Sequence, residues 1–181
     1  IIGVSNTPSV RFPGIANFTS SALNLEDVHC INLNSGCTGY VDALILASDI
    51  INNDKKSKVL IVTSDTYTKY IHKKNRNIRP LFSDGSSVSI VKFDKKGFKI
   101  TYRKTKNIPG TQNDLIFKGK NIEMNGPSVV AFAIKNVIPE ITKMIKNVDY
   151  IFVHQAGKIV INLLKINLPI KHFIPENYAK Y

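Results

Sequence analysis

Apolar residues in the first third of the chain form two strand-like runs separated by a helical pattern. The runs cover residues 28–33 and 58–63, and the second contains four consecutive apolar residues, as in a parallel strand buried on both faces. Between the runs, apolar residues recur at helical spacing, so we expect a helix over residues 38–51. This order predicts a βαβ unit and an α/β fold class.

The middle of the chain predicts a hairpin followed by a long helix. Residues 86–93 and 98–103 have strand character and are joined by a polar turn with Gly97, which favours an antiparallel pair. Apolar residues then recur at helical spacing over residues 127–146. Pro139 lies inside that helix and is expected to disturb it locally, because proline has no N–H to donate.

Each half of the chain shows the same order of strand, reactive side chain and helix. Cys37 lies between the first predicted strand and the first predicted helix. His154 follows a short apolar run at 149–153, predicted to be a strand, and precedes a helical pattern at 158–166. Sites in α/β proteins are built at the carboxyl ends of parallel strands. Both residues are therefore candidate catalytic residues.

The position of Cys37 predicts a reactive thiol. Unpaired N–H groups and the dipole at a helix start favour negative charge, so we expect Cys37 to be a thiolate at neutral pH. Its small neighbours Gly36 and Gly39 leave the sulfur accessible. Structural interpretations stay open, because free cysteines are often small buried hydrophobes and lone histidines are more often structural. Cys30, inside the predicted strand, fits that interpretation better.

Composition narrows the class of protein. The chain has 181 residues with 43% hydrophobic and 21% charged residues, which is typical of a globular domain. No apolar stretch approaches the roughly 20 residues that span a bilayer, so no membrane partner is expected. Two cysteines without framework spacing indicate a reducing compartment, and we expect a cytoplasmic protein. Neither a glycine-rich phosphate loop nor a zinc-binding spacing occurs, so no cofactor or metal is predicted.

The net charge of +12 leaves two interpretations open, a solvated basic surface or a docking patch for an acidic partner. Nucleic acid is disfavoured because the basic residues are not interleaved with aromatic side chains that could stack on bases. The basic residues that cluster most clearly are Lys73, Lys74, Arg76 and Arg79, and then Lys99, Arg103, Lys104 and Lys106.

Four ordered motifs carry a resemblance to a known family. In chain order they are Asn-Ser-Gly-Cys-Thr-Gly-Tyr at 34–40, Leu-Phe-Ser-Asp-Gly-Ser at 81–86, Met-Asn-Gly at 124–126 and Val-His-Gln-Ala at 153–156. In order and spacing they resemble 3-oxoacyl-(acyl-carrier-protein) synthase III, a condensing-enzyme family of thiolase-like fold. The resemblance runs through almost the whole chain.

The resemblance implies an activity and the residues that carry it. Cys37 would take an acyl group from coenzyme A and give its own backbone N–H to the acyl oxyanion. His154 would hydrogen-bond the malonyl thioester carbonyl during decarboxylation, and the carbanion would condense with the acyl-cysteine. Phe12 would reach from a dimer loop into the partner's acyl pocket. The residues implied to bind substrate are Phe12, Phe82, Asn125, Gly126, Val130 and Lys158.

The resemblance also implies an architecture and partners. We expect a layered αβαβα fold with mixed five-stranded sheets in two related halves, residues 1–93 carrying the nucleophile and residues 94–181 carrying the histidine. A homodimer, acyl-CoA and malonyl-acyl carrier protein as substrates, and no cofactor are expected. The family continues past the position of Tyr181 into a segment with its catalytic asparagine, so the chain is interpreted as an internal fragment, incomplete at both ends.

Three functions of different classes stay open. The first is decarboxylating condensation in fatty-acid initiation. The second is acyl transfer to an oxygen or nitrogen acceptor by a related thiolase-fold enzyme in glycan or secondary-metabolite assembly. It is kept because Gly157 and Ile159 stand where the family usually has asparagine and arginine, with Lys158 between them as a basic substitute. The third is a non-catalytic basic binding module.

Overall fold

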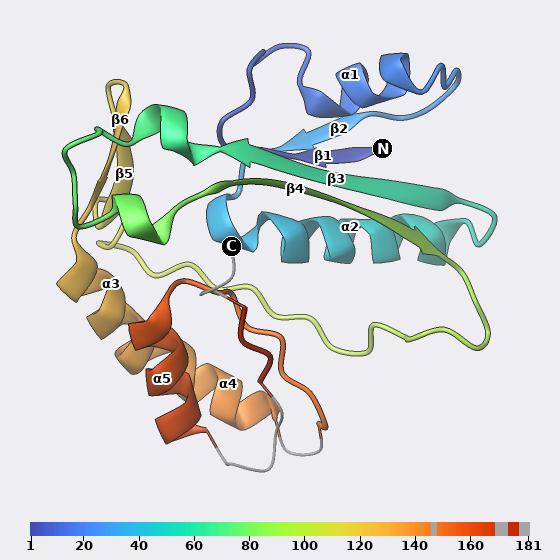
Figure 1. The fold of residues 1–181 in the computed structure, drawn as a ribbon. Coiled ribbons are helices and arrows are strands. Elements are labelled where there is room, and N and C mark those ends of the chain that lie inside the picture. The colour runs from blue at the N-terminus through green and yellow to red at the C-terminus, as the bar shows by residue number, and fades with distance from the viewer. Residues whose placement is uncertain (146–147, 169–173, 178–181) are drawn as a thin grey trace. The chain divides into compact units, whose positions relative to one another are not determined.

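The computed structural model describes residues 1–145, 148–168 and 174–177, which form two compact units (Figure 1). The first unit contains residues 1–67 and 84–107, and the second contains residues 68–83 and the described residues from 108 onward. No helix among the described residues is both long enough and apolar enough to cross a bilayer.

The first unit is built on a mixed four-stranded sheet. Its strands are β1 (Ile2–Val4), β2 (Ile31–Leu33), β3 (Lys58–Thr66) and β4 (Asp84–Lys92), in the order β2-β1-β3-β4. β1 runs parallel to β2 and β3, whereas β4 pairs with β3 in antiparallel register. The carboxyl ends of three strands therefore meet at one edge.

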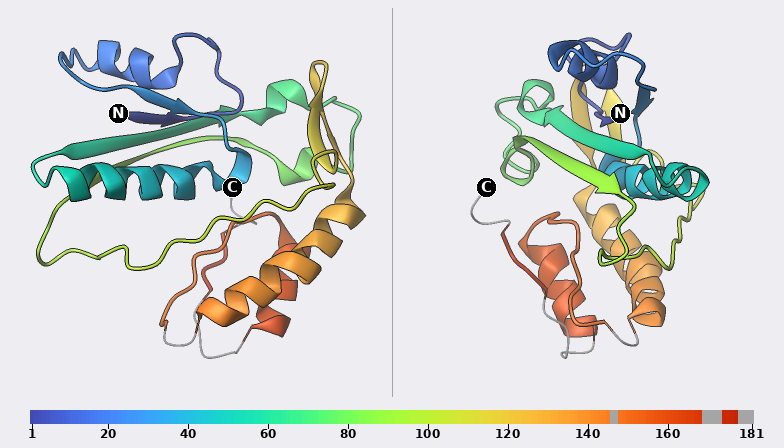
Figure 2. Two further views of the ribbon diagram at one scale, coloured as in Figure 1. Left: turned by 180° about the vertical axis from the view of Figure 1, so that it is seen from behind. Right: turned by 90° about the vertical axis from the view of Figure 1, so that its right-hand side faces the viewer.

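Two helices cover opposite faces of this sheet, as Figures 1 and 2 show. They are α1 (Ile15–Ala22) and α2 (Gly39–Asn53). Gly3 of β1 faces α1, because a Cβ atom there would lie 2.6 Å from Ile15 Cγ1. Its neighbours along β1 point to the other face, as the period of two along a strand requires.

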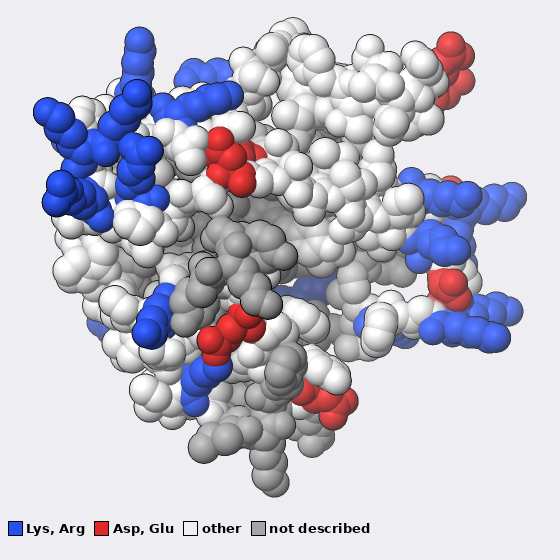
Figure 3. All heavy atoms as spheres, in the orientation of Figure 1, with Lys and Arg blue, Asp and Glu red and all other residues white. Residues whose placement is uncertain are grey.

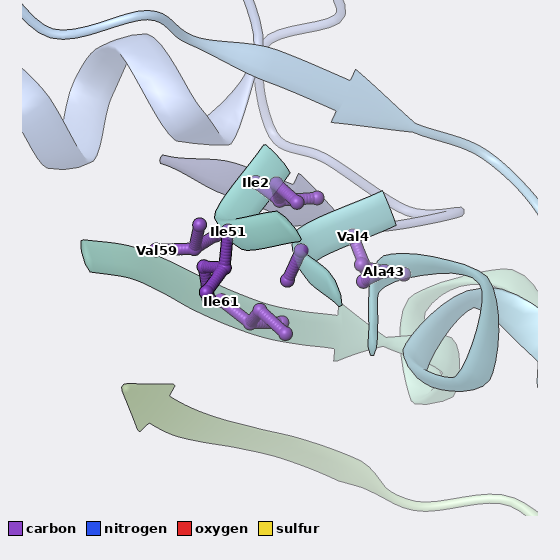
Figure 4. Packing of buried hydrophobic residues seen from close by; sticks show 7 residues of the cluster. Ile2, Val4, Ala43, Ile51, Val59 and Ile61 are labelled. Carbon is purple, nitrogen blue, oxygen red and sulfur yellow. The ribbon is translucent and has the colours of Figure 1, made fainter. Parts of the chain in front are cut away.

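The core of the first unit lies between the sheet and α2 (Figure 4). Ile61 of β3 and two alanines of α2 are fully buried, and the small alanines let the helix lie close to the strands. Burial of each large side chain contributes about 1.5–3 kcal/mol. The buried residues of this cluster are Ile2, Val4, Ala43, Ala47, Ile51, Val59 and Ile61.

The second unit contains one hairpin and several helical segments. The hydrophobic cluster of this unit contains the buried residues Ile138, Ile145, Leu164 and Leu168. The 3₁₀ turn Tyr67–Tyr70 crosses the boundary of the two units, and a second 3₁₀ turn spans Arg79–Leu81. The further elements are β5 (Leu115–Lys118), β6 (Asn121–Met124), α3 (Gly126–Phe132), a π-helical turn (Ala133–Val137), α4 (Ile138–Met144) and α5 (Lys158–Asn167).

The predicted βαβ unit is confirmed, with shifted ends. The first strand covers only Ile31–Leu33, the helix runs to Asn53, and β3 continues to Thr66. The long helix predicted over 127–146 is also present, interrupted by a π-helical turn just before Pro139. That interruption follows from the missing N–H and the ring of the proline. Residue 146, its predicted end, lies outside the described residues.

Two predicted strands do not form. Residues 98–107 have no strand structure, so the expected hairpin partner of β4 is wrong. The segment is exposed throughout, and even its apolar residues Phe98, Ile100 and Tyr102 are not buried. The run 149–153 holds only an isolated bridge at Tyr150. A strand needs a neighbour for its hydrogen bonds, and the sheet of the second unit consists of β5 and β6 alone among the described residues. Within the part of the chain that the structure describes, the first sheet has four of the five strands expected for the complete fold.

Candidate active site

Cys37 lies in a 3₁₀ turn, Gly36–Thr38, between the end of β2 and the start of α2. Gly36 has φ +56°, a conformation that glycine adopts without strain. Gly39 is buried, and a Cβ atom on it would clash with Val4 Cγ1. The turn can therefore sit directly on the end of β1, which places the cysteine where the sequence predicted it.

The environment of Cys37 favours the neutral thiol. Burial of the sulfur raises its pKa above the usual 9.0, its own backbone N–H lowers it, and the charge of Asp65 raises it further. The residue as a whole is exposed, but that area includes the backbone of a turn. Desolvation and a nearby carboxylate outweigh the helix start, so the expectation of a resting thiolate is wrong.

Asp65, near the end of β3, organises the loop that follows β1. Its Oδ1 accepts hydrogen bonds from the N–H groups of Asn6 and Thr7, both at 2.8 Å, and from Thr7 Oγ1 at 2.8 Å. The Asn6 side chain then bonds the cysteine turn, because its Oδ1 accepts the Gly36 N–H at 2.9 Å. Sequence analysis missed Asp65 and Asn6, since their partners lie about 30 to 60 residues away along the chain.

Tyr67 completes the polar surroundings of the thiol in the first unit. Its hydroxyl accepts a hydrogen bond from Asn6 Nδ2 at 3.0 Å. Burial, then the charges of Asp65 and Cys37, raise the pKa of Tyr67 to about 12. The phenol is therefore neutral at physiological pH and can only act as a hydrogen-bonding group there.

His154 belongs to the second unit and stands in an irregular segment four residues before α5. Burial of the ring lowers its pKa below 6.5, so the imidazole is neutral at pH 7, although the residue as a whole is exposed. The next residue ties this segment in place, because Gln155 Nε2 donates to the carbonyls of Val153 at 3.1 Å and Pro175 at 3.2 Å.

The other predicted site residues of the second unit occupy distinct positions. Asn125 caps α3, its side chain accepting the Ser128 N–H at 3.3 Å. Gly126 opens α3 and Val130 is half-buried on it, whereas Lys158 is exposed at the first position of α5. Their binding of substrate stays a prediction.

Phe82 follows the 3₁₀ turn Arg79–Leu81, close to the histidine segment. That proximity is seen at Gly157, where a Cβ atom would lie 3.3 Å from Leu81 Cδ2. With φ +116°, Gly157 also has a backbone conformation that disfavours side chains. This packing gives a structural reason for glycine after the Val-His-Gln-Ala motif.

Phe12 belongs to the first unit, in the loop between β1 and α1. It is 88% exposed, which is unusual for a large apolar side chain. Cys37 and Phe12 thus lie in the first unit, and the remaining predicted site residues lie in the second. Among the described residues, no group of three or more His, Cys, Asp or Glu side chains could hold a metal ion.

Comparison with known proteins shows which family the chain resembles. The sequence model described as 3-Oxoacyl-[acyl-carrier-protein (ACP)] synthase III matches residues 31–106, which include Cys37, α2, β3 and β4. Beta-ketoacyl-[acyl-carrier-protein] synthase III of Streptococcus agalactiae is 24% identical over 203 residues, covering 100% of this chain and 62% of the relative. The chain is similar in sequence to 3-oxoacyl-[acyl-carrier-protein] synthase III over its whole length.

Other synthase III proteins match over nearly the whole chain. The relative from Clostridium acetobutylicum is 27% identical over 207 residues, covering 99% of this chain and 63% of its own length. The synthase III structure from Thermus thermophilus has a TM-score of 0.89 at 22% identity, over 99% of this chain and 62% of that one. The Aquifex aeolicus structure gives 0.84 at 23% identity, over 96% and 60%.

These matches confirm the predicted fold class, a mixed α/β fold of the thiolase-like type. The chain spans about three-fifths of the length of the synthase III relatives that it matches. The division into halves at residues 93 and 94 stays a prediction.

Proposed function

We propose that the protein containing this chain is a condensing acyltransferase that initiates fatty-acid synthesis. The observation that carries the proposal is the position of Cys37, in a tight turn between β2 and α2 of a thiolase-like sheet. The thiol attacks an acyl-CoA, a thioester forms on sulfur, and coenzyme A leaves as its thiol. Because the resting group is protonated, its proton leaves as the carbon–sulfur bond forms.

His154 is proposed to act in the second step. Malonyl-acyl carrier protein loses carbon dioxide, and the electron pair released forms an enolate whose oxygen accepts a hydrogen bond from the imidazole N–H. The enolate carbon attacks the acyl-cysteine and expels the Cys37 sulfur, which gives 3-oxoacyl-acyl carrier protein. A neutral imidazole has the one N–H that this step needs, and the lowered pKa of His154 supports that form. Neither step requires a cofactor.

The basic surface of the second unit supports an anionic partner. Figure 3 shows Lys and Arg side chains gathered over the segment 68–83 and the β5–β6 hairpin. The sequence places Lys73, Lys74 and Arg76 in the first of these segments and Lys118 in the second, all exposed. We propose that an acyl carrier protein or the phosphates of coenzyme A bind there. In the other predicted cluster, Arg103 forms an ion pair with Asp49.

The outer strand of the first unit supports a homodimer. β4 pairs with β3 alone among the described strands, and it exposes Val88 by 63% and Ile90 by 69%. An edge strand with exposed apolar side chains favours pairing with another strand. The exposure of Phe12 supports the prediction that its loop reaches into the partner subunit of the dimer. We propose a dimer that works in the cytoplasm.

Product analysis tests the function. Full-length protein is mixed with an acyl-CoA and malonyl-acyl carrier protein, and 3-oxoacyl-acyl carrier protein is measured by mass spectrometry. His154→Ala should reduce its rate by about 100- to 1000-fold, as expected for loss of an oxyanion donor. His29→Ala, at an exposed histidine of the first unit outside the basic surface, should leave the rate unchanged.

Gly157 and Ile159 differ from the asparagine and arginine that are usual in the family. A second candidate function, acyl transfer to an oxygen or nitrogen acceptor, therefore stays open. An acyl adduct on Cys37 without any malonyl-dependent product would reject condensation and favour this candidate. The absence of both would favour a binding role.

A further inference from the structure

A chain of hydrogen bonds leads from the end of β3 to the turn that carries the cysteine. Asp65 Oδ2 accepts a hydrogen bond from Asn6 Nδ2 at 3.3 Å, while its Oδ1 holds the backbone N–H of Asn6 at 2.8 Å. Asn6 Oδ1 accepts the N–H of Gly36 at 2.9 Å. Gly36 directly precedes Cys37, so Asp65 is two hydrogen bonds away from the nucleophile's turn.

The chemistry of these groups fixes the direction of the Asn6 amide. A carboxylate can only accept hydrogen bonds and a backbone N–H can only donate. Asn6 must therefore turn its NH₂ group toward Asp65 and its carbonyl toward Gly36. If residue 65 were a neutral amide, it could present its own NH₂ to Asn6. The Asn6 amide would then reverse, and the Gly36 N–H would lose its acceptor.

The cysteine turn needs this external contact. It is a single turn of three residues, and Ser35 at its start makes no side-chain capping hydrogen bond. Within the turn, the Thr38 hydroxyl lies 2.8 Å from the Ser35 carbonyl and 2.9 Å from Asp42 Oδ2. These contacts hold its second half, whereas Asn6 holds the N–H at its beginning.

We propose that Asp65 is a positioning residue for Cys37, whose carboxylate orients the Asn6 amide so that Asn6 holds the Gly36 N–H and with it the turn that presents the thiol. The inference rests on the proposed role of Cys37 as nucleophile. The titratable groups of the first unit around this turn are Asp65, Tyr67 and Asp42. Because the Asp65 charge also raises the pKa of Cys37, its removal should change the pH profile of the thiol.

Three variants of the full-length protein test the proposal, each in a Cys30→Ala background. Asp65→Asn removes the negative charge and places an NH₂ donor opposite Asn6, so that the Asn6 amide no longer has to point its own NH₂ group at residue 65. Asn6→Ala removes the link but keeps the carboxylate. Asp54→Asn is the matched control, because Asp54 also accepts a backbone N–H in a turn, that of Lys56 at 3.0 Å, but precedes the opposite end of β3. Amide exchange of Gly36 is followed by NMR, and alkylation of Cys37 by iodoacetamide is followed against pH.

The proposal predicts that Gly36 exchange rises about tenfold in Asp65→Asn and in Asn6→Ala, while exchange in β3 is unchanged. The alkylation midpoint should fall in Asp65→Asn only. If Asp65→Asn does not fold, Asn6→Ala alone carries the exchange test. Unchanged Gly36 exchange in the folded variants, or an equal rise in Asp54→Asn, would overturn it. Neither readout uses an acyl donor, so a failure of this positioning proposal can be distinguished from a failure of the proposed acyl transfer.

Discussion

The resting state of Cys37 is decided by competition between its neighbours. Its own N–H, at the start of a helical segment, favours the thiolate, whereas burial of the sulfur and the Asp65 carboxylate favour the thiol. The second pair prevails, so Cys37 rests as a thiol, and in the proposed reaction it loses its proton only during attack. Such a thiol also resists oxidation at neutral pH, since oxidants react with the thiolate and not with the neutral thiol.

This balance predicts the pH dependence of thiol alkylation. Because burial of the sulfur raises the pKa of Cys37, little thiolate is present at neutral pH, so alkylation by iodoacetamide should still accelerate at a pH where an ordinary free thiol has already reached its full rate. The measurement uses Cys30→Ala protein and follows the peptide that carries Cys37 by mass spectrometry. A midpoint below pH 8 would show that the helix start prevails instead.

Among single residues, those with distinctive chemistry could be predicted from the sequence, whereas the residues that support them could not. Cys37 and His154 stand out because a thiol and an imidazole each precede a helical pattern. Asp65 looks like an ordinary polar residue at a strand end, and its importance depends on a loop about 60 residues earlier. The protonation state of Cys37 could not be predicted from the sequence either, because it depends on the atoms packed around the sulfur.

Among the elements, the fit of α2 against β1 controls where the cysteine turn lies. Gly39 opens α2 and is buried against Val4, which belongs to the core of the sheet. The absence of a side chain at Gly39 allows the helix start to approach the strand. Any atom added there must displace either the core or the turn.

Gly39→Ala should therefore destabilise the first unit by about 1–3 kcal/mol, as overpacking does. The added methyl group would clash with Val4 Cγ1, and Val4→Ala in the same protein should recover part of the loss. Gly85→Ala is the matched control, since a Cβ atom there would meet nothing within 4 Å. Urea unfolding measures these changes. Equal stability of Gly39→Ala and the control would refute this packing argument.

The strength of each pattern explains which elements could be predicted. β3 and the helical regions at 38–51, 127–146 and 158–166 combine clear periodicity with enough apolar residues to bury, and they were predicted with only their ends displaced, whereas α1 was not predicted. The segments 98–103 and 149–153 have strand-like residues, but a strand depends on a neighbour that no local pattern reveals. β1 and β2 pair across 29 residues, which sequence periodicity cannot show either.

For the whole molecule, the central expectation is a dimer that uses β4, one of the two outer strands of the first sheet as described. Ile90 lies on β4 and is 69% exposed. In a two-fold interface each exposed residue faces the same surface of its partner, so a charge introduced once appears twice. The resemblance suggested the dimer, and the sequence alone offered no physical sign of it, because exposure along β4 becomes visible only in the sheet.

Ile90→Lys should weaken dimerisation by about 100-fold, since two buried like charges would be brought together. Sedimentation of the full-length protein over a range of concentrations measures the change. Phe98→Lys is the control, because Phe98 is an exposed apolar residue of the first unit like Ile90 but lies outside the edge strand. A dimer that survives Ile90→Lys unchanged would place the interface elsewhere.

The most direct test of the account is intact-protein mass spectrometry after mixing the full-length protein with acetyl-CoA and a series of longer acyl-CoAs. We expect one acyl adduct in the wild type and in Cys30→Ala. It should be absent in Cys37→Ala and should be released when malonyl-acyl carrier protein is added. The donor that acylates fastest names the primer. An adduct that persists in Cys37→Ala, or no adduct from any donor, would contradict the claim that Cys37 is the nucleophile.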